Sequence, residues 1–363
     1  MMNNTGLYIH VPFCSSRCPY CDFFSETGGE ERKEAYIRGL HRDVKFYGEK
    51  YRGRTFDTVY FGGGTPSCLE GRDISEIFER IRDNFSITED AEITVECNPS
   101  SDLETFIPEA AKGGVNRISL GMQSAVDSER KRIGRKAGRE RVTEVLNIIR
   151  DEGIDNISLD LITGLPDQTV ESLDRSIDFC LESEVKHISA YMLILEPGTF
   201  FYRIRDRLNL PDEDEVCRQY LHLTERLNKA GIEQYEISNY AVPGYESRHN
   251  KKYWENVEYL GLGPSAHSYM DGRRFYFEGD TDAFIGGPQE EIYEGPGGST
   301  EEILMLSLRT VKGYRGPVTE SLLKRACDPE FEGLVSVDKD CIRLTEKGFL
   351  VSNYIINELT DAL

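Results

Sequence analysis

The sequence predicts an α/β protein built on a parallel sheet that closes wholly or partly into a barrel. Short apolar or β-branched runs, typical of strands, alternate with charged segments of helical spacing up to about residue 240. Such alternation indicates βαβ units, and six or more units favour a barrel over a short open sheet. In barrels of this kind the active site lies at the carboxyl ends of the strands.

The elements follow one another in a regular order. The expected strands are Leu7–Val11, Thr58–Phe61, Glu92–Glu96, Arg117–Gly121, Ile157–Leu161, His187–Leu193 and Gln234–Ile237. The expected helices are Glu31–Tyr47, Ile74–Asn84, Arg139–Glu152, Val170–Ser183 and Glu213–Ala230. Each strand is followed by enough chain for a crossover to the next parallel strand.

Beyond residue 240 the pattern changes. Residues 241–299 are expected to form a connecting segment, whose Gly-, Pro- and acid-rich part, 278–299, is typical of a linker or long surface loop. A helix over 300–309 then opens a small mixed C-terminal unit, which ends in an amphipathic helix after residue 348. The predicted division is therefore 1–240, 241–299 and 300–363.

The charge balance limits the partners. The chain of 363 residues has 43 Lys and Arg against 64 Asp and Glu, a net charge of −21. Such an acidic protein is not expected to bind nucleic acid, which needs a basic surface. No stretch has the composition of a signal peptide or reaches the roughly 18 apolar residues of a membrane span. The expected compartment is the cytoplasm, whose reducing conditions suit free thiols.

Three cysteines near the start carry the strongest chemical signal. Cys14, Cys18 and Cys21 form a CxxxCxxC pattern directly after the first expected strand. Thiolates at this spacing on one loop match the ligands of an iron–sulfur cluster. Three ligands on a [4Fe–4S] cluster leave one iron open for a small chelating ligand, and an open position marks a reactive rather than a structural metal site.

Zinc is the alternative ligand of these thiols. A structural zinc site needs four ligands, usually in two pairs, and the other six cysteines are scattered singly along the chain. His10, four residues before Cys14, is the one nearby candidate for a fourth ligand. A disulfide framework is not expected, because the chain is large and its nine cysteines are an odd number.

Further motifs lie at the ends of the expected strands. Gly62-Gly63-Gly64-Thr65 follows the second strand, and a glycine run allows a ligand to approach the backbone closely. Glu96 ends the third strand, Gln123 follows the fourth and Asp160 lies in the fifth. Polar groups there need partners, which a bound ligand or internal hydrogen bonds would supply. By itself, Arg135 would be interpreted as a surface residue.

Together these motifs resemble the radical SAM superfamily, within the group related to oxygen-independent coproporphyrinogen III dehydrogenase. The resemblance spans nearly the whole chain, through YIHVPFCSSRCPYCDF, YFGGGTPS, ECNP, RISLGMQS, IGR, DLITGLPDQT, YEISNYA, LSLRT and LTEKGFLVSNYI. It implies a partial (β/α)6 radical SAM barrel followed by a small C-terminal domain. It also implies one [4Fe–4S] cluster on Cys14, Cys18 and Cys21, with S-adenosylmethionine (SAM) on the open iron.

By matching motif positions, the resemblance also implies a set of SAM contacts. They are Tyr8, Gly63, Gly64, Thr65, Glu96, Gln123, Arg135 and Asp160. In the family's enzymes the cluster reduces SAM by one electron, and hydrogen abstraction follows. The cofactors supply this chemistry, and the barrel binds and shields them. An electron donor for the cluster is therefore an expected partner.

Two departures separate the chain from the dehydrogenase. That enzyme has a further cysteine two residues after the third, where this chain has Phe23, and a long N-terminal extension, whereas the first strand here begins near residue 6. Both features favour the haem chaperones of the same group. The expected function is therefore haem binding and transfer to an acceptor protein. The alternative is a radical SAM enzyme, either the dehydrogenase or a related oxidoreductase.

The run His249-Asn250-Lys251-Lys252-Tyr253-Trp254 is similar to the HNxxYW motif associated with haem binding in these chaperones. It offers an imidazole for the iron, aromatic faces for the macrocycle and lysines for the propionates. His249 is therefore the expected haem ligand, with His267 as second candidate. Residue chemistry alone would instead predict a structural loop with a hydrogen-bonded histidine.

Overall fold

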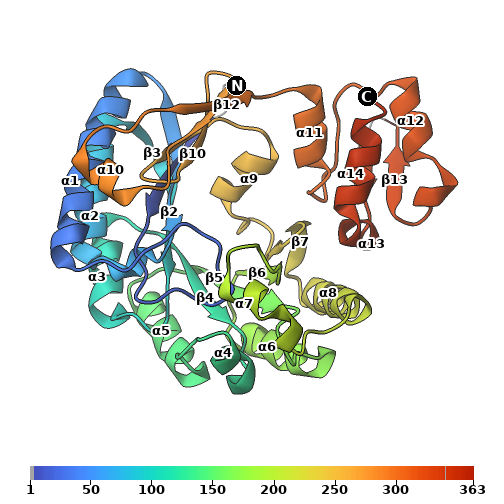
Figure 1. Ribbon diagram of the computed structural model, residues 1–363, viewed down its shortest axis with the longest axis horizontal. Helices are drawn as coiled ribbons and strands as arrows, with labels where there is room; N and C mark the ends of the chain where they lie inside the picture. Colours follow the sequence, from blue (N-terminus) through green and yellow to red (C-terminus); the bar gives the residue numbers. More distant parts are fainter. Residues whose placement is uncertain (1–3, 340) are drawn as a thin grey trace.

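The computed structural model describes residues 4–339 and 341–363, and its centre is one large sheet (Figure 1). Six strands of this sheet are parallel and adjacent in chain order. They are β1 (Thr5–Val11), β2 (Thr55–Gly63), β3 (Ser86–Cys97), β4 (Arg117–Gln123), β5 (Asn156–Thr163) and β6 (His187–Met192). The predicted fold class, a partial barrel of βα units, is confirmed.

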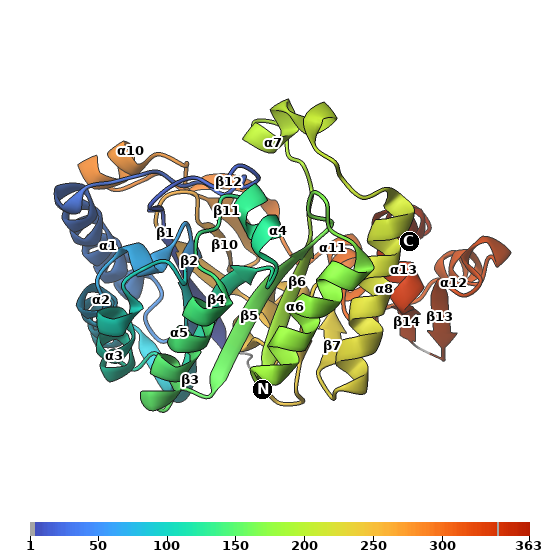
Figure 2. The same cartoon turned by 90° about the horizontal axis from the view of Figure 1, so that it is seen from below.

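Helices cover the outer face of these strands (Figures 1 and 2). They are α1 (Glu30–Lys50), α2 (Gly71–Asn84), α3 (Leu103–Gly113), α4 (Asp127–Arg132), α5 (Arg139–Asp151), α6 (Val170–Glu182) and α8 (Glu213–Lys229). The short helix α7 (Phe200–Arg203) lies instead above one end of the sheet (Figure 2). Two short 3-10 turns, η1 (Pro66–Cys68) and η2 (Arg205–Arg207), lie between them. Every helix predicted in this part is present, while α3, α4 and α7 were not predicted.

The strands have an apolar outer face and a polar inner face. Leu7, Ile9 and Val11 of β1 are fully buried in the cluster that includes α1 and α2, whereas Tyr8 and His10 alternate with them and face inward. The same alternation places many polar side chains inside the barrel: Thr58, Tyr60, Glu92, Thr94, Glu96, Arg117, Ser119, Ser158, Asp160, His187 and Ser189. The interior is thus suited to a polar ligand.

The sheet continues on both sides of the six parallel strands. Beyond β6 lie the antiparallel β8 (Asn239–Ala241) and β7 (Glu233–Glu236). Beyond β1 lie β9 (Tyr259–Leu262), β10 (His267–Met270), β11 (Arg273–Tyr276) and β12 (Ile292–Pro296), of which β9 is parallel to β1. The ends of the sheet, β12 and β7, are not paired with each other. The boundary predicted at residue 240 falls within β8.

The expectation of a linker or long surface loop over 278–299 is wrong in two places. Residues 281–286 form the helix α10 (Thr281–Gly286), and residues 292–296 form the edge strand β12. Glycine and proline are tolerated in β12 because an edge strand leaves one side of its backbone unpaired. The Gly-, Pro- and acid-rich composition of this segment is therefore compatible with an edge strand as well as with a loop.

The C-terminal unit packs beside α8 around a separate apolar cluster. It contains α11 (Thr300–Ser307), α12 (Glu320–Ala326), η3 (Pro329–Phe331), the hairpin of β13 (Val335–Asp338) and β14 (Cys341–Leu344), α13 (Glu346–Leu350) and α14 (Ser352–Thr360). Its hairpin is separate from the main sheet. The separate core is compatible with the predicted boundary at residue 299. The division into three parts remains a prediction.

One further helix, α9 (Arg248–Trp254), contains the HNKKYW run. Figure 1 shows it on the inner side of the sheet, opposite the outer helices, and it contacts β2. Among the described residues, no helix is both long and apolar enough to cross a membrane.

Candidate functional site

The loop after β1 carries the three predicted cluster ligands over the carboxyl end of the sheet. Cys14, Cys18 and Cys21 are free and partly exposed. The loop is fixed by backbone hydrogen bonds: the Cys14 N–H donates to the Glu26 carbonyl (2.8 Å), and the Phe201 N–H donates to the loop's Pro19 carbonyl (2.8 Å). Figure 2 shows α7, which begins at residue 200, above this edge of the sheet.

The three thiols of the loop are neighbours. Burial raises the pKa of Cys21, and the neighbouring thiols of Cys18 and Cys14 raise it further, so the three sulfurs lie close enough to interact. In the part of the chain that the structure describes, no three Cys, His, Asp or Glu side chains are arranged around one ion. A cluster needs a wider spacing, because each thiolate binds a different iron.

His10 was the alternative fourth ligand for zinc. Its Nε2 lies 3.0 Å from the Phe24 carbonyl and its Nδ1 lies 3.2 Å from the Tyr8 hydroxyl, so both ring nitrogens already have partners. Burial lowers its pKa to about 4, which keeps the ring neutral. The imidazole therefore braces the loop rather than completing a metal site in this arrangement.

The glycine run packs against the cysteine loop. Gly63 has a positive φ of 102°, and a Cβ there would lie 2.5 Å from the His10 ring. A Cβ on Gly64 would lie 2.8 Å from the carbonyl oxygens of Val11 and Phe13. The Gly64 N–H donates to Val11, and the Thr65 N–H donates to Phe13. The glycines thus allow close packing with the cysteine loop, whereas the sequence predicted that they allow close approach of a ligand to the backbone.

Thr65 connects the glycine run to the first cysteine. Its hydroxyl lies 3.3 Å from the Cys14 Sγ. A surface cavity of about 480 Å³ borders Cys14 and Cys68 between the loop and the N-terminal ends of α2 and α3. Cys68, one of the cysteines that are scattered singly in the sequence, is partly exposed and lies beside the predicted cluster loop.

Two predicted carboxylates face the barrel interior. The Tyr60 hydroxyl donates to Glu96 Oε1 (2.8 Å), and burial raises the pKa of Glu96 to about 7. The Ser119 hydroxyl lies 2.9 and 3.0 Å from the two oxygens of Asp160, and the Ser158 hydroxyl 3.1 Å from one of them. Burial also raises the Asp160 pKa. Two partly shielded carboxylates suit a ligand with positive charge, as SAM has in its sulfonium and amino groups.

The remaining predicted SAM contacts gather on the same rim. A Cβ on Gly121 would lie 2.9 Å from the Gln123 amide nitrogen and 3.9 Å from the Arg135 guanidinium, so these two side chains are neighbours. Arg135 donates to the Tyr20 hydroxyl (3.1 Å), but its buried Nε has no hydrogen-bond partner. An unpartnered guanidinium N–H near the cysteine loop fits the carboxylate end of SAM.

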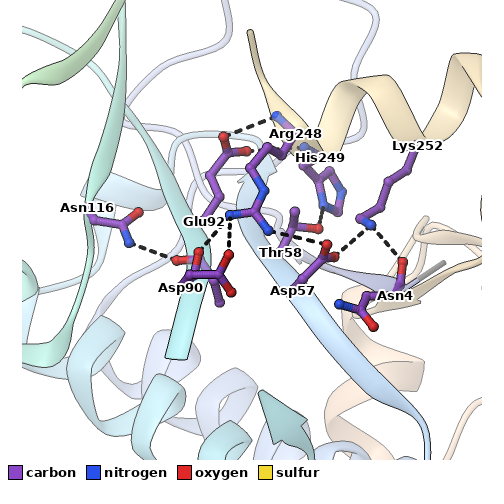
Figure 3. Close-up of polar contacts among 10 residues, drawn as sticks. Asn4, Asp57, Thr58, Asp90, Glu92, Asn116, Arg248, His249 and Lys252 are labelled. Atoms are coloured by element: carbon purple, nitrogen blue, oxygen red, sulfur yellow. Dashed lines mark hydrogen bonds and ion pairs between the residues drawn. The ribbon is translucent and has the colours of Figure 1, made fainter. Parts of the chain in front are cut away.

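His249 lies within the barrel and away from solvent. Its ring is 0% exposed. Its Nδ1 lies 2.8 Å from the Thr58 hydroxyl, and its Nε2 lies 2.8 Å from the Tyr253 hydroxyl (Figure 3 shows Thr58 and the ring). Burial lowers its pKa to about 3. Coordination of iron by His249 thus requires one of these hydrogen bonds to break, whereas His267 is exposed beside Glu294.

Sequence reasoning missed most of the polar groups inside the barrel. Arg117 is 1% exposed, and His187 bonds to the hydroxyls of Ser158 (2.8 Å) and Tyr235 (2.9 Å). The signal was available: polar residues recur at every second position of the strands, which is the period of one face of a sheet. The strands were interpreted as mostly apolar, and that description holds only for their outer face.

Comparison with known proteins identifies relatives of this chain and a shared fold. The model of the radical SAM superfamily matches residues 8–180. A solved structure of coproporphyrinogen III oxidase (HemN) from Escherichia coli superposes with a TM-score of 0.86, covering 100% of this chain and 91% of that one. Its sequence identity is 22%, so this likeness shows a shared fold.

Curated relatives extend the comparison to the whole chain. The heme chaperone HemW of Lactococcus lactis is 33% identical over 97% of this chain and 96% of its own length. HemW of Bacillus subtilis is 32% identical over 96% and 97%. HemW of Escherichia coli is 37% identical over 74% of this chain and 71% of its own length. The chain therefore belongs to the HemW family of the radical SAM superfamily.

Proposed function

We propose that this protein binds haem and transfers it to an acceptor protein, and that it carries one [4Fe–4S] cluster and SAM. The observation that carries the proposal is the alignment with heme chaperones over nearly the full length of both chains. The alignment includes the C-terminal unit as well as the barrel, so it relates this chain to whole chaperones rather than to a shared cofactor domain alone.

The geometry of the barrel rim supports the cofactor assignment. Cys14, Cys18 and Cys21 would hold the cluster, which when bound would take up electrons one at a time from a donor protein, the second partner that we propose. The carboxylates of Glu96 and Asp160 would face the cationic groups of SAM. All nine cysteines are free, which supports a reducing compartment such as the cytoplasm.

The haem ligand follows less directly from the geometry. His249 is the sequence-based candidate, and it would have to leave Thr58 or Tyr253 to bind iron. His267 needs no such rearrangement, because its side chain is about half exposed. Coordination of haem by His267 therefore requires no displacement of α9.

The alternative function is a radical SAM oxidoreductase, such as coproporphyrinogen III dehydrogenase. The presence of all the cluster and SAM residues that the family resemblance implies favours it. Phe23 argues against it, because this side chain, 69% exposed, stands where the dehydrogenase has its additional cysteine. The two functions differ in whether a porphyrinogen is turned over.

A single preparation tests both functions. The protein is reconstituted anaerobically with iron and sulfide, titrated with haem, and then assayed for coproporphyrinogen decarboxylation with SAM and a reductant. We expect a saturable Soret band and no decarboxylation. A weaker Soret band in His249→Ala would identify His249 as the haem ligand. A weaker band in His267→Ala would identify His267. Decarboxylation without haem binding would overturn the proposal in favour of the enzyme.

A further inference from the structure

Charged side chains of β2 and β3 clamp helix α9 onto the sheet (Figure 3). The Glu92 carboxylate accepts the N–H groups of Arg248 and His249, each at 3.1 Å. Asp57 pairs with Lys252 at 2.6 Å and with Arg248 at 3.3 Å. The first turn of the helix is thus held by carboxylates from two neighbouring strands, β2 and β3, and its position relative to them is fixed.

The clamp also fixes the orientation of the His249 ring. Thr58 binds one ring nitrogen and Tyr253 binds the other, both at 2.8 Å. A neutral imidazole has one donor and one acceptor nitrogen, so both of its hydrogen-bonding groups are satisfied. Burial keeps the ring neutral by lowering its pKa to about 3. The ring therefore has no unused hydrogen-bonding capacity in this position.

The fixed ring lies against Tyr60. The two ring centroids are 5.1 Å apart with the planes at 28°, a stacked arrangement. Tyr60 is largely buried, and its hydroxyl donates to Glu96 Oε1 at 2.8 Å. The hydroxyl end of the Tyr60 ring is closely packed, because a Cβ on Gly62 would lie 2.9 Å from the ring and 3.1 Å from Glu96 Oε1. The imidazole therefore packs against the side chain whose hydroxyl holds the Glu96 carboxylate.

We infer that His249 is a positioning residue for the SAM site: its ring fixes Tyr60, and Tyr60 fixes the Glu96 carboxylate. The inference rests on the proposed placement of SAM beside Glu96 and is independent of haem binding. It gives the HNKKYW run a role inside the barrel, where α9 links the sheet to the cofactor rim. Removal of the imidazole leaves space into which Tyr60 can turn, so Glu96 loses its hydrogen bond.

The test is a double-mutant cycle on SAM affinity. His249→Ala, Tyr60→Phe and the double variant are reconstituted, and the SAM dissociation constant is measured by equilibrium dialysis. Each single variant should bind SAM about tenfold more weakly, the order of effect of one hydrogen bond to a charged group. The double variant should lose no more than either single variant, because both changes break the same chain of contacts. His41→Ala, a half-buried histidine on α1, should bind SAM normally.

Iron and sulfide content and the EPR signal of the reduced cluster are measured on the same samples. We expect full cluster loading in all variants, and a smaller change of the EPR signal on SAM addition in His249→Ala and Tyr60→Phe. Unchanged SAM affinity in His249→Ala, or a loss in the double variant equal to the product of the single losses, would overturn the inference. If His249→Ala does not fold, Thr58→Val frees the same ring from one partner and should weaken SAM binding to a smaller extent.

Two further measurements separate this inference from the proposals on which it stands. Glu96→Gln tests the placement of SAM. Unchanged SAM affinity in that variant would contradict the proposal that SAM binds beside Glu96, and not only the role of His249. Haem titration of His249→Ala tests the chaperone function. Normal haem binding together with weakened SAM binding is the result that we expect if His249 acts only through Tyr60.

Discussion

Replacing Asp57 by alanine is expected to destabilise the protein by about 2–3 kcal/mol. The change leaves the two cations of α9, Lys252 and Arg248, without their shared carboxylate. Loss of one partner of a buried pair costs about 3–5 kcal/mol. The expected loss lies at or below the lower end of this range because the Asp57 side chain is 17% exposed and because Lys252 keeps a hydrogen bond to the Asn4 carbonyl (2.7 Å).

Urea unfolding followed by fluorescence measures this loss. Trp254 is the only tryptophan of the chain and ends α9, so its emission reports the helix directly. Asp282→Ala is the control: this carboxylate is 82% exposed and pairs with Arg32 at 2.7 Å, and such surface pairs contribute at most about 1 kcal/mol. Equal midpoint shifts in the two variants would refute the argument that burial makes the α9 clamp strong.

Three other changes test the cofactor rim. Cys18→Ala should abolish stable iron and sulfide binding after reconstitution, whereas Cys180→Ala should bind both normally, and equal loading of the two would refute the cluster assignment. Gly63→Val should lower cluster loading as well as SAM binding, because its side chain would meet the His10 ring and displace the cysteine loop. SAM affinity should fall as the pH drops through about 7, where Glu96 becomes protonated and loses the charge that faces the ligand, and this dependence should disappear in Glu96→Gln.

The barrel could be predicted from the sequence because its strands are short, β-branched and separated by helices of regular length. β1 to β6 overlap the predicted runs, with the ends extended by up to six residues, as in β3 (Ser86–Cys97). The extension has a physical reason: Ser86 and Ile87 at the start of β3 pair with Thr55 and Phe56 of the neighbouring strand β2, although the polar residues that follow them have low strand propensity. Local composition thus detects the centre of a strand better than its ends.

The second half of the sheet could not be predicted, because its strands depend on tertiary pairing. β9 and β12 have four and five residues, and β12 lies among glycines, prolines and acids that predict a loop. β9 is ordered by a neighbour that is distant in sequence, because it pairs with β1, and β12 is ordered by its pairing with β11. Contacts over such separations leave no trace in local periodicity.

The site shows the same division between local and long-range information. The CxxxCxxC spacing is local, and it predicts neighbouring thiols that the structure places on one loop. The role of His249 depends on β2, nearly two hundred residues earlier, and the sequence motif alone could not distinguish a haem ligand from a hydrogen-bonded brace. An imidazole beside tyrosine and lysine suits both. The structure favours the brace, because Thr58 and Tyr253 occupy both ring nitrogens, and a ligand role requires one of these hydrogen bonds to break.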